Sequence, residues 1–548
     1  MTWWKEAVVY QIYPRSFKDS NGDGIGDLPG IFSKLDYIKS LGVDVIWLCP
    51  IYDSPNDDNG YDVSDYRQIM KDFGTMTDFD ELLEGIHHRG MKLIMDIVPN
   101  HTSDEHRWFK ASAESEDNPY RDYYIWRKGE KDKLPNNWPS FFSGNAWNYN
   151  EKTQSHYLHL FSKKQPDLNW ENPKVRQEIY DIMHFWFKKG IDGFRMDVVS
   201  LISKPPGLPN TESNVFTEII SKYYANGPRV HEYLKEMNQK VLRHYDCMTV
   251  GEGPGITLDN ALNYVGEDRE ELNMVFHFGH MYIDNGPGGK YDPIPYDLVD
   301  MKKVFNDWVA KLKGKGWGSI FLGNHDFPRV VSRFGNDGLY WQESTKLIAT
   351  LLLSMRGTPF IFQGDEIGMT NVAYESIEEY QDIETLNSWK DAMQKGVDPE
   401  NFMKLVHQQS RDNARTPFQW NTTKNGGFSD GIPWLKSNDN FELINVENQE
   451  NNKDSVLNFY RKMVKYRKEN PTLVYGDYEC YQVEHPELFL FKRSDEENTY
   501  WVLLNFSEYH HDVDVQLPEN LSLEMNNYVE PNASKRLRPW EAKILKER

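Results

Sequence analysis

The sequence predicts a closed barrel of eight parallel strands surrounded by helices, a (β/α)8 TIM barrel. Eight short runs rich in Val, Ile, Leu and Phe alternate with segments of helical periodicity. Near-continuous apolar strands separated by helices indicate a parallel sheet buried on both faces, and eight such units favour a closed barrel. Seven of the runs end in carboxylate, histidine, asparagine or glutamine residues. A barrel carries its reactive groups at the carboxyl ends of its strands, so this pattern also predicts an active site.

The predicted strands are assigned to residues 8–14, 43–52, 92–101, 193–199, 247–252, 274–278, 318–326 and 358–366. The segment 102–172 is too long and too rich in aromatic residues for a simple loop. It therefore predicts a subdomain inserted after the third strand. A second long insertion, 367–418, follows the eighth strand. From residue 478 onward, short alternating segments predict a C-terminal antiparallel β domain. The barrel is therefore assigned to 1–101 and 173–477, the inserted subdomain B to 102–172, and the C-terminal domain to 478–548.

The composition excludes several classes of protein. The 548 residues are 39% hydrophobic, enough for a large core, but no apolar run approaches the roughly 20 residues of a membrane span. A formal net charge of −22 argues against nucleic acid binding, which requires Lys and Arg to neutralise phosphates. The first residues lack a secretion signal, and the cysteines form no CxxC pair, with Cys49 and Cys247 inside apolar runs. We therefore expect a monomer in a reducing cytoplasm, with no membrane partner.

Three carboxylates follow apolar strands, where a charged group is unfavourable unless it is paired or functional. The run GFRMD ends at Asp197, MTVGE ends at Glu252, and FLGNHD ends at Asp326. Two carboxyl groups at one site can cleave a glycosidic bond, one acting on the anomeric carbon and the other donating a proton to the leaving oxygen. Sugar cleavage is therefore the chemistry that these residues predict.

The neighbours of the carboxylates suggest a division of roles. Arg195 precedes Asp197 by two residues on a strand, so both side chains point to the same face. We expect Arg195 to keep Asp197 ionised, as a nucleophile requires. Glu252 ends a hydrophobic strand, where an apolar wall would raise its pKa and suit it to act as the acid. Asp326, beside His325, would bind sugar hydroxyls or stabilise positive charge.

Several motifs in fixed order extend this reading. The segments QIYPRSF, DDNGYD, DIVPNHTSDEH, DGFRMDV, VGE, NHD and RDNARTPFQW resemble the α-amylase family of glycoside hydrolases, and within it the bacterial oligo-1,6-glucosidases and dextran glucosidases. The resemblance implies a retaining double displacement, with Asp197 as nucleophile, Glu252 as acid/base and Asp326 as transition-state stabiliser. It also implies a set of glucose-pocket residues, namely Asp58, Tyr61, His101, Phe161, Gln165, Arg195, His325 and Arg411.

Within this implied pocket, Asp58 and Arg411 would bind the non-reducing end of the substrate and make the enzyme exo-acting. His101 taken alone reads as a structural histidine, but its position at the end of the third strand favours a site residue. Val198 follows the nucleophile, and in the enzymes that the chain resembles Val at this position accompanies α-1,6 activity. The resemblance therefore implies hydrolysis of α-1,6, isomaltose-type bonds in short oligosaccharides.

The segment DSNGDGIGD, residues 19–27, predicts a cation-binding loop. Its candidate oxygen ligands are the side chains of Asp19, Asn21, Asp23 and Asp27 and the carbonyl of Ile25, and Gly24 stands at the sharp turn. The bidentate Glu of an EF-hand is absent, because residue 30 is Gly. A solvated Asp/Gly turn is the alternative. Similar loops bind Ca²⁺ in the glucosidases that the chain resembles, which favours a structural Ca²⁺ and no organic cofactor.

Some positions depart from those glucosidases, and other functions stay open. Gly253, Gly279 and Phe327 replace the usual residues around what we expect to be the leaving-group site. Non-catalytic heavy subunits of amino-acid transporters share the barrel, but they are membrane-anchored and have usually lost triad residues. Nearer alternatives are an α-1,4-preferring glucosidase, a sucrose hydrolase or isomerase, and a trehalose-6-phosphate hydrolase. The last would need a basic cluster at the entrance. Lys163 and Lys164 are the candidates, but the glucosidases that the chain resembles share the stretch SKKQPDLNW, so these lysines do not discriminate.

Overall fold

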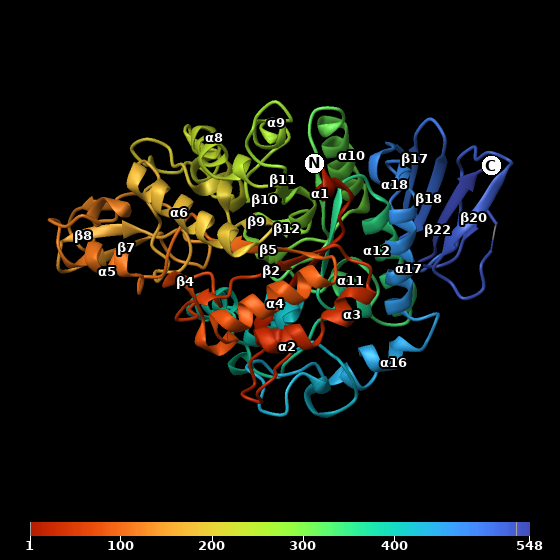
Figure 1. Cartoon of the computed structure of the whole chain (residues 1–548), viewed down its shortest axis with the longest axis horizontal. Coiled ribbons are helices and arrows are strands. Elements are labelled where there is room, and N and C mark those ends of the chain that lie inside the picture. The colour runs from red at the N-terminus through yellow and green to blue at the C-terminus, as the bar shows by residue number, and fades with distance from the viewer. Residues whose placement is uncertain (1, 533) are drawn as a thin grey trace.

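The computed structural model describes residues 2–532 and 534–548, and its centre is the predicted barrel (Figure 1). The barrel strands are β1 (Val9–Ile12), β2 (Val45–Leu48), β5 (Lys92–Ile97), β9 (Gly193–Met196), β10 (Met248–Gly253), β11 (Met274–His277), β14 (Ser319–Ile320) and β15 (Thr358–Phe362). They pair in parallel in the order β11-β10-β9-β5-β2-β1-β15-β14. The two end strands approach each other, since Ser319 Oγ donates to the Val275 carbonyl at 2.8 Å. The barrel is therefore nearly closed, and all eight predicted runs contain a barrel strand.

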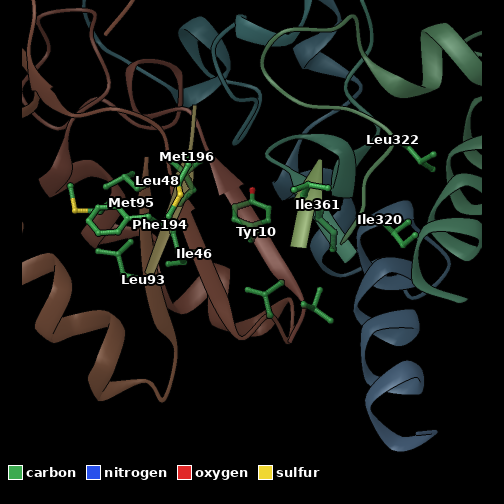
Figure 2. Close-up of a cluster of buried hydrophobic side chains, with 14 of the residues drawn as sticks. Tyr10, Ile46, Leu48, Leu93, Met95, Phe194, Met196, Ile320, Leu322 and Ile361 are labelled. Atoms are coloured by element: carbon green, nitrogen blue, oxygen red, sulfur yellow. The ribbon is translucent and has the colours of Figure 1, made fainter. Parts of the chain in front are cut away.

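Alternation along the strands separates two cores. Tyr10, Ile46, Leu93 and Phe194 point outward and pack in the large cluster beneath the helices (Figure 2). Their neighbours in sequence point into the barrel, where Trp47 stacks on Phe276 at 5.5 Å and Phe276 meets Phe360 at 4.7 Å. Burial of both faces explains why the strands read as continuous apolar runs.

The seventh strand is shorter than predicted. The run 318–326 forms only the two-residue strand β14, and residues 321–326 leave the sheet. Asn324 bends this segment, because its Oδ1 accepts the Asp326 amide at 2.8 Å. The polar end of the run therefore forms a turn that places Asp326 above the barrel.

The main covering helices are α4 (Met76–His88), α6 (Pro173–Lys189), α8 (Val230–Lys240), α10 (Leu298–Leu312), α12 (Trp341–Ser354) and α17 (Val456–Glu469). Helix α6 shows how the sequence fixes them. Asn172 caps its first turn by accepting the Lys174 amide, Pro173 occupies the first helical position, and Gly190 ends it at φ 110°. Its buried face includes Ile179, Met183 and Trp186, which pack against the barrel.

Two smaller sheets flank the barrel. In the insertion after β5, β6 (Trp126–Lys128), β7 (Trp147–Asn150) and β8 (Ser155–Leu158) pair antiparallel in the order β6-β8-β7, next to α5 (Arg107–Glu114). At the other end of the molecule (Figure 1), β16 (Asp477–Tyr481), β17 (Leu488–Ser494), β18 (Thr499–Asn505), β22 (Ala542–Glu547) and β20 (Leu521–Asn526) form the C-terminal antiparallel sheet. An unpredicted hairpin, β12 (Asn285–Gly286) and β13 (Gly289–Pro293), follows β11.

Buried cations join the C-terminal sheet to the barrel. Lys302 of α10 is fully buried and donates to three carbonyls of the segment 482–488. Arg493 of β17 donates to the carbonyl of Ser354 at 2.5 Å and to that of Leu473 at 2.6 Å. Carbonyls at the end of α12 carry the negative pole of that helix, so Arg493 caps it across the domain boundary. None of the helices formed by the described residues combines the length and apolar composition of a membrane span.

Candidate active site

A cavity of about 720 Å³ opens at the carboxyl ends of the barrel strands. Ten of the twelve predicted catalytic and substrate-binding residues line it, namely Asp58, Tyr61, His101, Phe161, Asp197, Val198, Glu252, His325, Asp326 and Arg411. The other two, Gln165 and Arg195, lie directly behind this wall and bond to residues that form it. The structure therefore brings all twelve residues into one site.

Arg195 is the centre of the catalytic cluster. Its Nη1 contacts Asp96 Oδ1 at 2.8 Å and Asp197 Oδ1 at 2.7 Å, and its Nη2 contacts Glu252 Oε2 at 2.8 Å. The guanidinium is 1% exposed, so little water screens these pairs. Asp197 and Glu252 are thus held against one planar group, which fixes their separation and orientation.

The electrostatics of this pair differ from the prediction for Asp197. Burial raises the pKa of Asp197 well above its usual value, Glu252 and Asp96 add to the rise, and Arg195 lowers it only in part. Burial likewise raises the pKa of Glu252, and Arg195 again acts in the opposite direction. Arg195 contacts three carboxylates, so it offsets the effect of burial on the pKa of Asp197 only in part. The two carboxyls titrate as one unit that retains a proton more readily than isolated acids do.

Asp326 is in the opposite electrostatic state. Its Oδ1 meets Arg415 at 3.0 Å and Arg411 at 3.3 Å, and its Oδ2 lies 3.2 Å from His325 Nε2. Burial would raise the pKa of Asp326, but the facing His325 and the two arginines hold it well below its usual range. Asp326 therefore supplies a fixed negative charge next to a pair of carboxyls that can exchange a proton.

An ion pair lies in one part of the cavity wall. Arg411 Nη2 contacts Asp58 Oδ1 at 3.0 Å, and Gln165 Nε2 donates to Asp58 Oδ2 at 3.0 Å. Arg411 is also bound by Asp382 at 2.6 Å. Burial raises the pKa of Asp58 to about 6, and Arg411 opposes the rise. The carboxylate and guanidinium offer acceptors and donors side by side, as sugar hydroxyls require.

Two neutral histidines complete this pocket. Burial lowers the pKa of His325 to about 3 and that of His101 to about 4. His325 stacks on Tyr61 at 5.2 Å, and His101 lies 5.1 Å from the ring of Phe161. Both histidines are uncharged at neutral pH and can donate or accept hydrogen bonds to a neutral ligand.

Val198 has an unusual backbone. Its φ of 36° and ψ of 40° place a β-branched residue in the left-handed region, which costs about 1–3 kcal/mol. Two hydrogen bonds hold it there, from its N–H to Glu252 Oε2 at 3.0 Å and from the Leu201 N–H to its carbonyl at 2.9 Å. Its side chain lines the cavity beside Phe161 and Phe216. Val198 therefore orients the acid and also shapes the wall.

The sequence did not reveal several residues that the structure places at the site. Asp382 binds Arg411 and also caps α13 (Ile383–Gln394) by accepting two of its amides. Lys290, on the unpredicted hairpin, bonds to Glu384 at 2.9 Å, and both side chains line the cavity. These residues follow no barrel strand. The only sequence signal for any of them was that Asp382 precedes a helical segment. Such an Asp predicts a helix cap and not a site residue.

A buried lysine fastens subdomain B next to His101. The ammonium of Lys204 lies 2.6 Å from Asp167 Oδ2, 2.7 Å from Asn100 Oδ1 and 2.7 Å from the Leu201 carbonyl. Asp167 is fully buried and belongs to the inserted segment, and Asn100 ends the third strand segment of the barrel. One cation thus joins three parts of the chain around the pocket wall.

Two of the three departures noted in the sequence do not line the cavity, although each is next to a residue that does. A Cβ on Gly279 would meet Val304 of α10 at 3.0 Å. A Cβ on Gly253 would meet Ile256 at 2.3 Å, so a larger residue there would first have to displace Ile256. Phe327 alone lines the cavity, 5.9 Å from Phe278.

The loop of residues 19–27 is closed by its own side chains. Asp19 accepts the amides of Asn21, Gly22 and Gly24, and Asn21 accepts the amide of Asp23. Gly24 has φ 92°, and a Cβ there would lie 1.8 Å from the Ile432 carbonyl oxygen, so only Gly fits. The Asp27 carboxylate accepts three bonds, from the amide and hydroxyl of Ser20 and from the Gly30 amide.

The donor set of this loop suits a hard cation, although the carboxylates are not clustered. Within residues 2–532 and 534–548, no three His, Cys, Asp or Glu side chains gather into a metal site by themselves. The predicted ligands include an amide oxygen and a carbonyl, however, and oxygen ligands of these kinds with Gly at the sharp turn fit Ca²⁺. Burial would raise the pKa of Asp19, yet hydrogen bonds from Ser429 and Gly24 hold it below its usual value, so the carboxylate is charged.

The sequence matches proteins of known family along its whole length. The model of the alpha-amylase catalytic domain matches residues 11–476. The oligo-1,6-glucosidase of Halalkalibacterium halodurans is 56% identical over 99% of this chain and 98% of that protein. The oligo-1,6-glucosidase of Parageobacillus thermoglucosidasius is 55% identical over 99% of each. The trehalose-6-phosphate hydrolase of Bacillus subtilis (strain 168) is 46% identical over 95% of this chain and 92% of that protein.

Solved structures agree in fold over nearly all residues. A mutant isomaltulose synthase of Erwinia rhapontici NX5, in complex with its natural substrate sucrose, is 45% identical, with a TM-score of 0.95 over 100% of this chain and 99% of that one. A mutant trehalose-6-phosphate hydrolase of Bacillus licheniformis is 43% identical, with a TM-score of 0.94 over 99% of each chain. With the barrel, the carboxylate cluster and these matches together, the chain belongs to the alpha-amylase family.

Proposed function

We propose that the protein is a retaining, exo-acting α-glucosidase that hydrolyses α-1,6 bonds at the non-reducing end of short oligosaccharides. One observation carries this function. Asp197, Glu252 and Asp326 meet in one cavity, and the Asp58–Arg411 ion pair lines the same cavity. We infer that this pair blocks the pocket beyond the reacting carboxylates, so that the pocket admits one terminal sugar and excludes the middle of a chain.

The geometry supports a double displacement. Asp197 attacks the anomeric carbon while Glu252 donates its proton to the leaving oxygen, and a covalent glucosyl-enzyme forms. Glu252 then removes a proton from water, which attacks the same carbon and releases glucose with its configuration retained. Contact of both carboxylates with Arg195 keeps them close, which favours the shorter separation of retaining enzymes, about 5–5.5 Å. The constant charge of Asp326 stabilises the cationic transition state.

The α-1,6 preference is supported by the relatives and by Val198. Oligo-1,6-glucosidases with 55–56% identity cover nearly the whole chain. The stiff side chain of Val198 fills space beside the carboxylates, where an α-1,4-linked ring would attach directly. An α-1,6 link adds a methylene and a rotatable bond, so the leaving ring can turn away from this wall.

The decisive experiment is a comparison of initial rates on isomaltose, panose, maltose, sucrose, trehalose and trehalose 6-phosphate under identical conditions. We expect isomaltose to be cleaved faster than maltose, with α-glucose as the first product detected by NMR. Faster cleavage of maltose would overturn the bond preference, and β-glucose as first product would overturn retention.

A phosphosugar substrate is the second candidate, since trehalose-6-phosphate hydrolases are among the relatives. The cavity offers the phosphate group no unpaired cation, because each Lys and Arg that lines its described wall is paired with a carboxylate. Lys290 binds Glu384, Lys395 binds Asp391, Arg333 binds Asp284 and Arg411 binds Asp382. Of the two lysines considered at the entrance, Lys164 is bound to Asp104 and Glu105, Lys163 is exposed, and neither lines the cavity. We therefore expect trehalose 6-phosphate to be a poor substrate.

We also propose one structural Ca²⁺ in the loop of residues 19–27, held by oxygens of Asp19, Asn21, Asp23, Ile25 and Asp27. We further propose that the protein is located in the cytoplasm and is a monomer. The location is supported by three cysteines that form no disulfide, of which Cys49 is buried. Cell fractionation tests the location, and sedimentation velocity tests the monomer.

A further inference from the structure

The loop that carries Asp58 depends on a neighbouring carboxylate, that of Asp62. Asp62 is fully buried, and its Oδ1 accepts the Ser54 hydroxyl and the Asp58 amide, both at 3.0 Å. Its Oδ2 accepts the Asp57 amide at 2.8 Å. The backbone of Asp58 is thus bonded directly to Asp62, while the side chain of Asp58 is bonded to Arg411 and Gln165.

The loop that carries Asp58 has an unfavourable backbone conformation, which hydrogen bonds must hold in place. Three of its residues have positive φ, namely Asn56 at 63°, Asn59 at 45° and Gly60 at 97°. Residues other than Gly adopt this region only at a cost, and surrounding contacts must hold them there. The loop is also attached to subdomain B, because Ser162 Oγ donates to Asp57. The loop therefore bridges the second barrel strand and the inserted subdomain.

Within the part of the chain that the structure describes, the Asp62 carboxyl accepts hydrogen bonds only from the loop itself, and burial raises its pKa to about 7, although the amides of Asp58 and Asp57 oppose the rise. No Lys, Arg or His among the described residues lies within salt-bridge distance of Asp62. A buried carboxylate is unfavourable unless hydrogen bonds compensate it, and here two backbone amides and one hydroxyl do so. An amide side chain of the same shape would direct an NH₂ group at a donor and lose at least one of these bonds.

We propose that Asp62 is a positioning residue for sugar binding. It fixes the position of Asp58 and thereby the affinity of the site for the terminal glucose. The inference rests on the proposed function. Asp62 does not itself line the cavity, whereas Asp58 and Tyr61 do. Its effect is therefore on substrate affinity at the glucose end, common to all substrates, and not on the leaving group.

The test is the kinetics of Asp62→Asn in the full-length protein. We expect KM for isomaltose and for maltose to rise by about tenfold each, with kcat changed less than about threefold. The ratio of the two specificity constants should stay unchanged. A merely structural role would lower the melting temperature and leave KM of the folded enzyme unaltered, and that result would overturn the proposal.

Two further variants keep the test decisive. Ser54→Ala removes one donor and retains the carboxylate, so it should raise KM by about twofold even if Asp62→Asn does not fold. Asp62→Asn made in an Asp58→Asn background should add little to KM, because Asp62 acts through Asp58; full additivity would contradict the proposal. Asp495→Asn is the control for the donor set, since Asp495 also accepts one hydroxyl and two amides, at an exposed position in the C-terminal domain.

The control should leave KM unchanged. If the wild type cleaves none of the glucosides, the proposed function fails. If the wild type is active and Asp62→Asn has the wild-type KM, the inference about Asp62 fails alone.

Discussion

Asp197, Glu252 and Asp326 each carry a different part of the proposed chemistry, and substitution of each should be severe. Asp197→Asn, Glu252→Gln and Asp326→Asn should fold and lose at least about a thousandfold in kcat, about 4 kcal/mol, because each removes a charge or proton needed in the transition state. Asp365→Asn is the control. Asp365 is also a buried carboxylate after a barrel strand, beside Arg329 at 3.8 Å, but it lies outside the cavity. Retention of more than about a tenth of the activity in a triad variant would remove that residue from its role.

Val198 allows the bond preference to be tested by volume. Val198→Ala should raise the ratio of maltose to isomaltose cleavage by about ten- to two-hundredfold, equivalent to about 1–3 kcal/mol, because two methyl groups are removed from the wall. Val198→Thr keeps the shape and tests polarity. If the ratio is unchanged in Val198→Ala, the wall does not set the preference, and Phe327 becomes the next residue to vary.

At the scale of elements, Lys204 should determine how firmly subdomain B is held. Lys204→Met leaves the buried carboxylate of Asp167 without its cation, which costs about 3–5 kcal/mol. We expect faster hydrogen exchange in β8 and a lower kcat/KM. Lys222→Met, at an exposed i,i+4 pair with Glu218, is the control and should change neither. Unchanged exchange in β8 would show that other contacts hold the subdomain.

The loop of residues 19–27 gives a prediction for metal removal. Chelation should lower the melting temperature by linkage and leave kcat unaffected at temperatures where the protein is folded. Asp23→Ala should abolish the dependence of the melting temperature on Ca²⁺. Elemental analysis that finds no metal, together with an unchanged melting temperature after chelation, would reduce the loop to a solvated turn.

Some of these residues could be predicted from the sequence and others could not, and the difference has a physical reason. Barrel strands are buried on both faces, so their apolar runs and polar ends stand out, and Asp197, Glu252 and Asp326 were found in this way. Lys204 and Asp382 act through tertiary contacts between distant segments, and no local pattern marks them. The raised pKa of Asp197 was not predicted either, because it depends on how many carboxylates share Arg195.

At the scale of the whole molecule, the barrel and the C-terminal domain should unfold as one unit. Burial lowers the pKa of Lys302 to about 8, and among the described residues its ammonium finds hydrogen-bond partners in carbonyls of the segment 482–488. A chain ending at residue 476 would expose this cation and uncap α12, so it should not fold. Calorimetry of the full chain should show a single transition. Two separate transitions would show that the domains are energetically independent.

The blocked pocket that we infer from the Asp58–Arg411 pair has a kinetic consequence. Glucose held there can leave only by the route that the departing sugar has just taken, so release is ordered, with the leaving sugar first and glucose last. Glucose should then compete with substrate for the free enzyme. A longer chain must dissociate and re-enter after every cleavage, so degradation of an oligosaccharide is distributive and intermediates of every length accumulate.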